Sequence, residues 1–206
     1  MTRRTSVGVA LASLALSLSL FGEWAVRAQQ PAAGSGDDGP RYTSKGELVR
    51  PTDYREWIFV SSGLGMTYGP AALGTVPRFD NVFVNPSSYR SFMKTGVWPD
   101  KTMFILEVRS SEGKKSINRD GRFQGQIAGI EAEVKDGTRY PDKWAYFAFG
   151  GGALLKESVA ALPKTASCYS CHTQNTAVEQ TFVQFYPTLF EVARRLGTVK
   201  PSYTEP

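Results

Sequence analysis

Both cysteines and the only histidine of the chain lie within one pentapeptide, Cys168-Tyr169-Ser170-Cys171-His172. This is the C-x-x-C-H sequence to which c-type haem is covalently attached. Residues three apart lie on one side of a helical turn, so the thiols of Cys168 and Cys171 can each add to a vinyl group of the same porphyrin. The imidazole of His172 can then supply the proximal nitrogen to iron. The pentapeptide therefore predicts one covalently bound haem c, held by Cys168, Cys171 and His172, with His172 as the metal ligand.

Three other kinds of chemistry remain open for these residues. A structural zinc site needs four ligands, and two cysteines and one histidine would have to be completed by carboxylates. A thioredoxin-like redox pair normally follows a strand in a βαβ unit, and the sequence has no evident unit of that kind. A disulfide between Cys168 and Cys171 would close a very short loop and would stabilise the fold little.

The N-terminus is typical of a secretory signal peptide. Arg3 and Arg4 precede an apolar stretch over residues 7–21, and Val26-Arg27-Ala28 offers small or branched residues at the usual cleavage spacing. An uncleaved membrane anchor is the alternative, but the stretch is shorter than the roughly 20 residues that span the hydrocarbon core. We therefore predict a signal peptide over residues 1–28 and a periplasmic location in a bacterium.

The rest of the chain reads as a linker and one domain. Residues 29–41 are rich in Pro, Gly, Ser and Asp, and they contain no large apolar residue, which predicts a flexible linker. Residues 42–206 are long enough for a single domain with one core. The whole chain has a formal net charge of +5, and the signal peptide removes more basic than acidic residues. The mature protein is thus only mildly basic, which argues against a nucleic-acid partner.

The first two-thirds of this domain consist of short apolar runs separated by turns. Asn85-Pro86 is typical of a helix start and Gly96 of a helix end, so we expect a short helix over residues 87–94. The run over residues 123–135 alternates between apolar and charged residues in its second half, as a strand does. The expected strands are residues 57–60, 82–84, 102–108, 123–135 and 144–149.

After the glycines at 150–152 the apolar period changes to that of an amphipathic helix. Pro187 must break or kink this helix, and Gly197 ends it. The apolar positions are Val178, Phe182, Phe185, Leu189, Val192 and Leu196. We therefore predict an α+β fold, in which helices pack on an antiparallel β-sheet of about five strands and a C-terminal helical segment binds haem.

Several segments of the mature domain match the pattern of one known family. The most specific match joins the C-x-x-C-H pentapeptide to Phe182-Val183-Gln184-Phe185-Tyr186-Pro187. The other matching segments are residues 45–48, 54–57, 82–89, 94–96, 129–136 and 144–146. Over these segments the chain resembles the cytochrome P-460 family, which includes the cytochromes c′-beta. The resemblance implies an antiparallel sheet with packed helices, one haem c per chain and a homodimer.

Two kinds of function divide that family. Its namesake members carry a lysine joined to the haem and oxidise hydroxylamine, with a pocket carboxylate as the proton acceptor. The cytochromes c′-beta bind nitric oxide or carbon monoxide at a five-coordinate iron under an aromatic cap. The resemblance puts Leu106 at the lysine position, where leucine has no nitrogen to form the cross-link. Lys94 and Lys101 are the nearest substitutes, and both are expected to be solvated.

The same resemblance makes Glu131 the candidate catalytic proton acceptor. A carboxyl group buried near iron would have a raised pKa that suits proton transfer. The alternative is that Glu131 and Glu133 form the solvated side of an edge strand.

Together these features predict a periplasmic monohaem c-type cytochrome that binds small nitrogen oxides or diatomic gases, such as nitric oxide and carbon monoxide, at an open iron site. A hydroxylamine-oxidising enzyme is the alternative; any enzyme activity would be that of a haem oxidoreductase acting on hydroxylamine or nitric oxide. A second alternative is an electron-transfer cytochrome with a periplasmic redox partner. It would need a sixth iron ligand, for which the mature chain offers Met66, Met93 and Met103. The candidates for an aromatic cap are Phe83, Phe104, Phe123 and Phe147.

Overall fold

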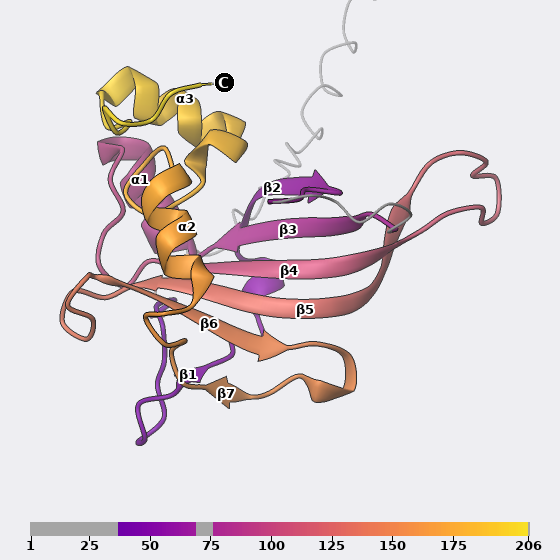
Figure 1. Cartoon of the computed structure of the whole chain (residues 1–206), viewed down its shortest axis with the longest axis horizontal. Helices are drawn as coiled ribbons and strands as arrows, with labels where there is room; N and C mark the ends of the chain where they lie inside the picture. The colour runs from indigo at the N-terminus through magenta and orange to yellow at the C-terminus, as the bar shows by residue number, and fades with distance from the viewer. Residues whose placement is uncertain (1–36, 69–75, 206) are drawn as a thin grey trace, which may run out of the picture. The chain divides into compact units, whose positions relative to one another are not determined.

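A computed structural model describes residues 37–68 and 76–205 of the chain. Its centre is a five-stranded antiparallel sheet with the strand order β2-β3-β4-β5-β6 (Figure 1). The strands are β2 (Ile58–Leu64), β3 (Arg78–Val84), β4 (Met103–Glu112), β5 (Phe123–Lys135) and β6 (Trp144–Gly150). Each strand pairs with the strand that follows it in the chain, so β5 is an inner strand between β4 and β6. The predicted α+β fold and its antiparallel sheet are confirmed.

The predicted signal peptide, residues 1–28, lies outside the described residues, as do residues 29–36 of the predicted linker. Among the residues that are described, no helix is long and apolar enough to cross a bilayer.

The three α-helices are α1 (Pro86–Thr95), α2 (Ser167–Asn175) and α3 (Pro187–Leu196). Figure 1 shows them gathered at one end of the sheet. Helix α1 begins and ends as the sequence predicts, with Pro86 in its first turn and Gly96 in the left-handed conformation after it, at φ 69°. The carboxylate of Asp38 accepts the backbone N–H of Ser87 at 2.7 Å, so a distant segment caps the start of this helix.

At the other end of the sheet, the hairpin that joins β4 and β5 projects away from the helices (Figure 1). Residues 113–122 form its turn. Ile117 in this turn is 96% exposed, so the hairpin tip contributes little to the core.

The structure corrects the long C-terminal helix expected from the apolar period. Val178 and Thr181 form an isolated β-bridge, and only a 3₁₀ turn, η3 (Val183–Phe185), precedes α3. Pro187 begins α3 instead of kinking a longer helix, because proline has no N–H to donate and pushes the preceding residue out of helical geometry. Tyr186 accordingly has φ −116° and ψ 85°. The predicted end at Gly197 is confirmed.

Two apolar clusters cover the two faces of the sheet. On β5, Ile130, Ala132 and Val134 point into one cluster, as the alternation predicts. This cluster is closed by a small sheet of β1 (Leu48–Val49) and β7 (Ser158–Val159), by the 3₁₀ turn η1 (Tyr54–Glu56) and by Trp57. A further 3₁₀ turn, η2 (Gly152–Leu154), follows β6.

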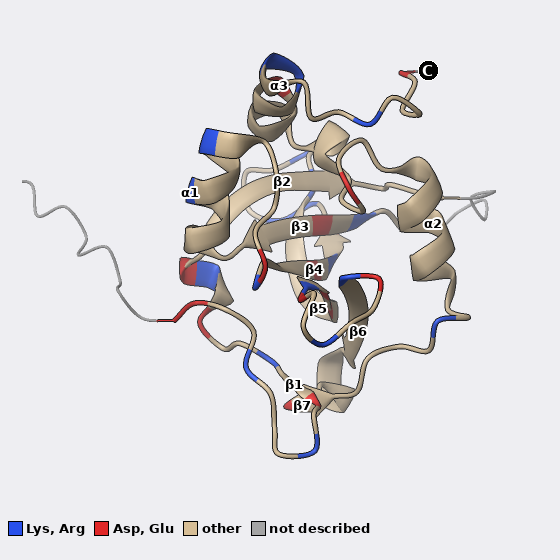
Figure 2. Ribbon diagram, turned by 90° about the vertical axis from the view of Figure 1, so that its left-hand side faces the viewer, with Lys and Arg blue, Asp and Glu red and all other residues tan. Residues whose placement is uncertain are grey.

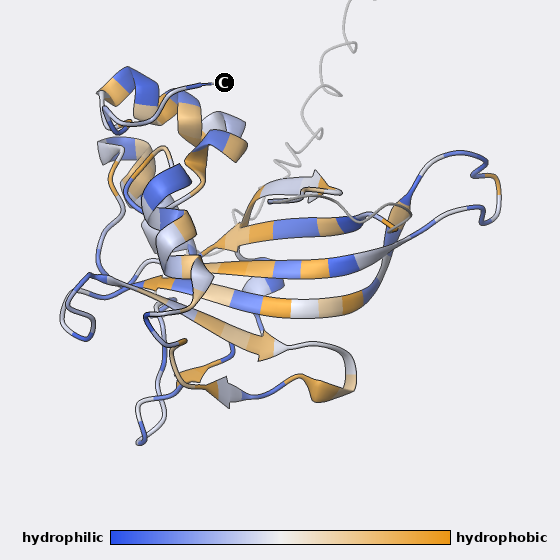
Figure 3. Ribbon diagram, viewed as in Figure 1, coloured by the Kyte–Doolittle hydropathy of each residue, from blue (hydrophilic) through white to orange (hydrophobic). Residues whose placement is uncertain are grey.

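The other face of the sheet packs against the helices. Its cluster joins Phe104 of β4 to Phe92 of α1 and to Leu189 of α3. Strand β6 carries no strongly hydrophilic residue along its length (Figure 3), because most of it is buried between the two clusters.

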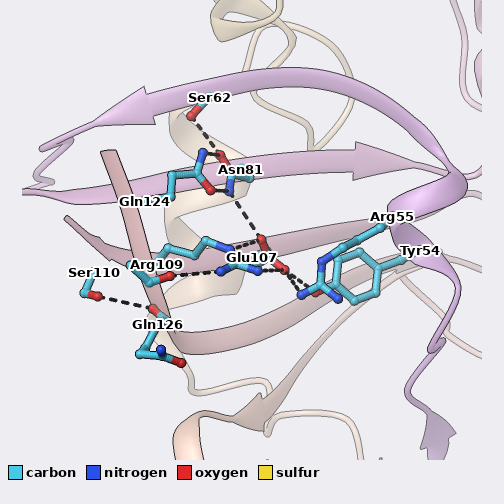
Figure 4. A network of polar contacts seen from close by, with 10 residues as sticks. Tyr54, Arg55, Ser62, Asn81, Glu107, Arg109, Ser110, Gln124 and Gln126 are labelled. Carbon is cyan, nitrogen blue, oxygen red and sulfur yellow. Dashed lines mark hydrogen bonds and ion pairs between the residues drawn. The ribbon is translucent and has the colours of Figure 1, made fainter. Parts of the chain in front are cut away.

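A polar network interrupts the first cluster at Glu107 of β4, which is 2% exposed (Figure 4). Its carboxylate accepts hydrogen bonds from the Tyr54 hydroxyl and from the guanidinium groups of Arg55 and Arg109. Asn81 donates to it more weakly, at 3.4 Å. Burial raises the pKa of Glu107, but the hydrogen bonds from Arg109, Tyr54 and Arg55 outweigh burial and lower it to about 2.

Candidate functional site

A pocket of about 410 Å³ lies between the helical face of the sheet and the C-terminal segment. The sheet contributes Asp80, Val82, Phe104, Leu106, Glu131, Glu133 and Tyr146 to its wall, and the C-terminal segment contributes Cys168, Cys171, His172, Phe182, Phe185 and Tyr186. Residues more than a hundred positions apart in the sequence therefore meet at one site. The wall is mostly apolar and aromatic, with carboxylates on the sheet side and sulfur and imidazole groups on the helix side.

Helix α2 presents the pentapeptide to this pocket. Cys168, Cys171 and His172 all line it, and both thiols are free. The helix carries no Lys, Arg, Asp or Glu (Figure 2) and has no buried residue. Tyr169 helps to hold it: its ring meets that of Tyr146 edge-on at 4.8 Å, and its hydroxyl donates to a backbone carbonyl at 3.2 Å. Burial raises the pKa of the Cys168 thiol.

The ring of His172 is fixed on several sides. Its Nδ1 lies 2.7 Å from the backbone carbonyl oxygen of Gln180, and its ring centre lies 4.5 Å from that of Tyr146 and 4.7 Å from that of Phe182. A carbonyl oxygen can only accept, so Nδ1 carries the proton in the neutral ring and Nε2 keeps its lone pair. The imidazole is therefore in the tautomer that can bind a metal through Nε2.

Glu133 lies beside this histidine. Its Oε1 is 3.6 Å from Nδ1 of His172, and this buried oxygen has no hydrogen-bond partner among the described residues. Burial raises the pKa of Glu133, although the neighbouring His172 opposes the rise. Burial lowers the pKa of the His172 imidazole, but Glu133, the carbonyl of Gln180 and the charge of Glu131 together outweigh burial and raise this pKa.

Glu131 and Leu106 face the same pocket from neighbouring strands. In the register of the sheet, Leu106 pairs with Glu131 on one side and with Val82 on the other. Glu131 is open to solvent through the pocket, yet partial burial raises its pKa; the charge of Asp80 adds to this effect and that of His172 opposes it. Because β5 is an inner strand, the edge-strand alternative for Glu131 and Glu133 is wrong.

The structure shows which of the other candidate residues named from the sequence line the pocket. Of the proposed aromatic caps, Phe104 and Phe147 line the pocket and Phe83 and Phe123 do not; of the methionines, only Met66 lines it. Lys94 and Lys101 do not reach the pocket wall either, and Lys101 pairs with Asp136 at 2.6 Å.

Asp80, Tyr146 and Tyr186 are among the pocket residues that the sequence did not single out as site residues. The alternation of a strand could have identified Tyr146. This residue follows Trp144 by two positions on β6, and so both side chains lie on the face of the sheet that packs against the helices. Asp80 lies two residues before Val82 on β3 and is found in the same way. Periodicity does not find Tyr186, although this residue stands in the segment 182–187 that carries the family resemblance.

The donor set suits a covalently held haem better than a bare metal ion. Two thiols three residues apart and an imidazole with Nε2 available face an apolar pocket, as a porphyrin requires. Within residues 37–68 and 76–205, no group of three or more His, Cys, Asp and Glu side chains is arranged to hold a metal ion.

Comparison with known proteins gives one family. The family model described as cytochrome P460 matches residues 51–183, a range that includes all five strands of the main sheet and the whole of α2. The search of curated proteins found no match for the chain.

Proposed function

Because the chain belongs to the cytochrome P460 family, we propose that it is a periplasmic c-type cytochrome with one covalently attached haem, which binds small nitrogen oxides or diatomic gases at an open iron site. The family makes the protein a haem-binding, iron-containing cytochrome. One observation carries the finer assignment: Cys168, Cys171 and His172 line the same pocket as Leu106. The N-terminal sequence supports the periplasm, where haem c is attached.

Different residues of the chain would bind different parts of the haem. Cys168 and Cys171 would form the two thioethers, and His172 would bind iron through Nε2. The carbonyl of Gln180 keeps the imidazole in the required tautomer and orientation. When bound, the haem supplies an iron that changes oxidation state and coordinates a small ligand. The apolar side chains of the pocket wall, such as Val82 and Phe104, would keep bulk water from that ligand.

Leu106 supports gas binding over hydroxylamine oxidation. It lines the pocket with an apolar side chain, and it cannot form the nitrogen bond to the porphyrin that the oxidising members of the family carry. A neutral diatomic ligand needs no charged donor in such a pocket.

Hydroxylamine oxidation is the second candidate, and Glu131 favours it. Its carboxyl group lines the pocket and has a raised pKa, so it could accept a proton from a bound nitrogen compound. An electron-transfer role would instead need a sixth ligand, and Met66 is the methionine on the pocket wall.

The first prediction is covalent attachment. Haem should remain with the wild-type chain through SDS electrophoresis, and the mass should exceed that of the mature chain by one haem. Replacing Cys168 and Cys171 together with alanine should abolish attachment, because no other cysteine exists in the chain. Ser170→Ala is the matched control, since it changes an exposed residue of the same helix that carries no thiol. Unchanged attachment in the double variant would refute the proposal.

The second prediction is an open iron site. Ferric protein should be high-spin, and the ferrous Soret band should be that of an ordinary haem c that shifts when nitric oxide or carbon monoxide is added. Low-spin iron would point to Met66 or another strong ligand and to electron transfer. A red-shifted Soret band in the native protein, or turnover of hydroxylamine with an electron acceptor, would instead support the oxidase.

A further inference from the structure

Glu133 is a buried carboxylate with an unusual set of neighbours. It comes from the middle of the sheet, where it pairs in register with Phe104 of β4 and Tyr146 of β6. Its side chain is only 13% exposed, and its Oε1 has no hydrogen-bond partner among the described residues. A buried acceptor without a donor costs free energy, so such groups in native proteins call for a functional explanation.

Two polar groups on β5 and β6 that could approach Glu133 donate to other acceptors. Lys135, on the same strand, pairs with Glu179 at 2.6 Å and donates to the carbonyl of Trp98 at 2.5 Å. The hydroxyl of Tyr146 donates to the side chain of Gln180 at 3.0 Å. Among the described residues, His172 is the one ion-pair partner of Glu133, with 3.6 Å between Oε1 and Nδ1.

We infer that Glu133 is a positioning residue that acts on the iron through His172. Its Oε1 lies 3.6 Å from Nδ1, beside the carbonyl of Gln180 that accepts the Nδ1 proton, and so places a negatively charged oxygen next to this N–H group. A negatively charged oxygen beside the Nδ1–H group increases the electron density of the imidazole and makes Nε2 a stronger donor to a metal. Glu133 thereby stabilises ferric over ferrous haem. This inference rests on the proposed function, because it requires His172 to bind iron.

The pocket provides a control for this inference in a second carboxylate. Glu131 lines the same pocket from the same strand, and among the described residues no hydrogen bond or ion pair joins it to His172. Removing the charge of Glu131 therefore changes the field in the pocket without changing the oxygen atoms next to Nδ1. A direct effect through the imidazole and a general effect of pocket charge can thus be separated.

The test compares Glu133→Gln, Glu131→Gln and wild-type holoprotein by redox titration and by resonance Raman spectroscopy of the ferrous iron–histidine stretch. In Glu133→Gln the ferrous-to-ferric ratio at a fixed potential should rise on the order of tenfold. This corresponds to a midpoint potential about 59 mV higher for a one-electron couple. The iron–histidine frequency should fall. Glu131→Gln should leave that frequency unchanged and shift the potential less.

Several outcomes would overturn the inference. A wild-type potential and frequency in Glu133→Gln would do so, and so would equal potential shifts in both variants with no change in frequency. If Glu133→Gln does not fold, Glu133→Asp decides, because it keeps the charge but withdraws the carboxylate oxygen from Nδ1 and should give a smaller shift of the same sign. Failure of the proposed function is distinguishable, because wild-type protein would then lack covalent haem or an iron–histidine stretch.

Discussion

Two glutamates on neighbouring inner strands are buried with opposite consequences. Glu107 on β4 faces two guanidinium groups and a tyrosine hydroxyl, and its pKa falls to about 2. Among the described residues, the ion-pair partner of Glu133 on β5 is a single imidazole, and burial raises the pKa of Glu133. The partners that the fold supplies, and not the residue type, decide which charge is stabilised. The first glutamate stabilises the sheet, and the second lies at the site.

Glu107 gives a prediction about acid stability. Its pKa in the folded state is about 2, below the ordinary value of 4.5, so its contribution to stability is fully present above pH 4.5 and is lost as the pH falls towards 2. Glu107→Gln should lower the free energy of unfolding by about 3 kcal/mol at neutral pH, because Arg109 loses its buried partner. The variant should also reduce the dependence of stability on pH between 4.5 and 2. Urea denaturation of the holoprotein at several pH values measures both effects.

The control for this prediction lies on the same strand. Glu112 is exposed at the end of β4, so Glu112→Gln should change stability by less than about 0.5 kcal/mol. An equal loss of stability in the two variants, or a Glu107→Gln variant with the acid sensitivity of the wild type, would contradict the role given to the Glu107 network.

At the scale of elements, the five strands of the main sheet could be located, although β2, β3 and β4 are longer than expected. The C-terminal helix could be predicted only in part. The alternation over residues 123–135 located β5 with its observed bounds, because a strand buried on one side must repeat every two residues. The apolar stripe before Pro187 led to a wrong prediction of helix, because burial there does not come from a regular helix. Val178 is buried there, but the backbone of this segment is satisfied by a side chain: Gln184 accepts the N–H of Ala177 and donates to the carbonyl of Asn175. Such bonds come from tertiary structure and leave no period in the sequence.

The residues of the site could likewise be predicted only in part. The three residues of the C-x-x-C-H motif that face the pocket could be named from local spacing alone, since one helical turn brings them together. The carboxylates of Asp80 and Glu133 come from separate strands, and alternation gives only which residues of each strand share a face. Which of the two faces meets α2 depends on how the chain crosses the sheet after β6, and the sequence carries no local signal for this.

For the whole molecule we propose a homodimer, as the resemblance implied. The exposed side of β2 supports it: this strand ends the sheet, and its Phe59 and Leu64 are 54% and 49% exposed. Edge strands with exposed apolar residues tend to pair across a two-fold axis. Sedimentation at micromolar concentration should therefore give about twice the mass of the mature chain.

Lysine substitutions locate the interface. Replacing Phe59 and Leu64 together with lysine should yield monomers, because like charges would face each other across the two-fold axis. Ile117→Lys changes an exposed apolar residue of the hairpin tip and should leave the dimer intact. A wild-type monomer would refute the dimer, and dissociation by Ile117→Lys alone would move the interface to the hairpin.

The projecting hairpin between β4 and β5 also divides the pocket between two stretches of chain. A cut within residues 113–122 would leave Asp80 and Leu106 on the first fragment, and Glu131, Glu133 and the C-x-x-C-H motif on the second. The fragments would rejoin along the long antiparallel pairing of β4 with β5 and the short pairing of β1 with β7. The proposed haem would travel with the second fragment and would recover the part of its wall formed by Val82, Phe104 and Leu106 only from the first. Its absorption spectrum would thus report fragment complementation, and the protein would act as a split chromophore whose colour depends on reassembly of the sheet.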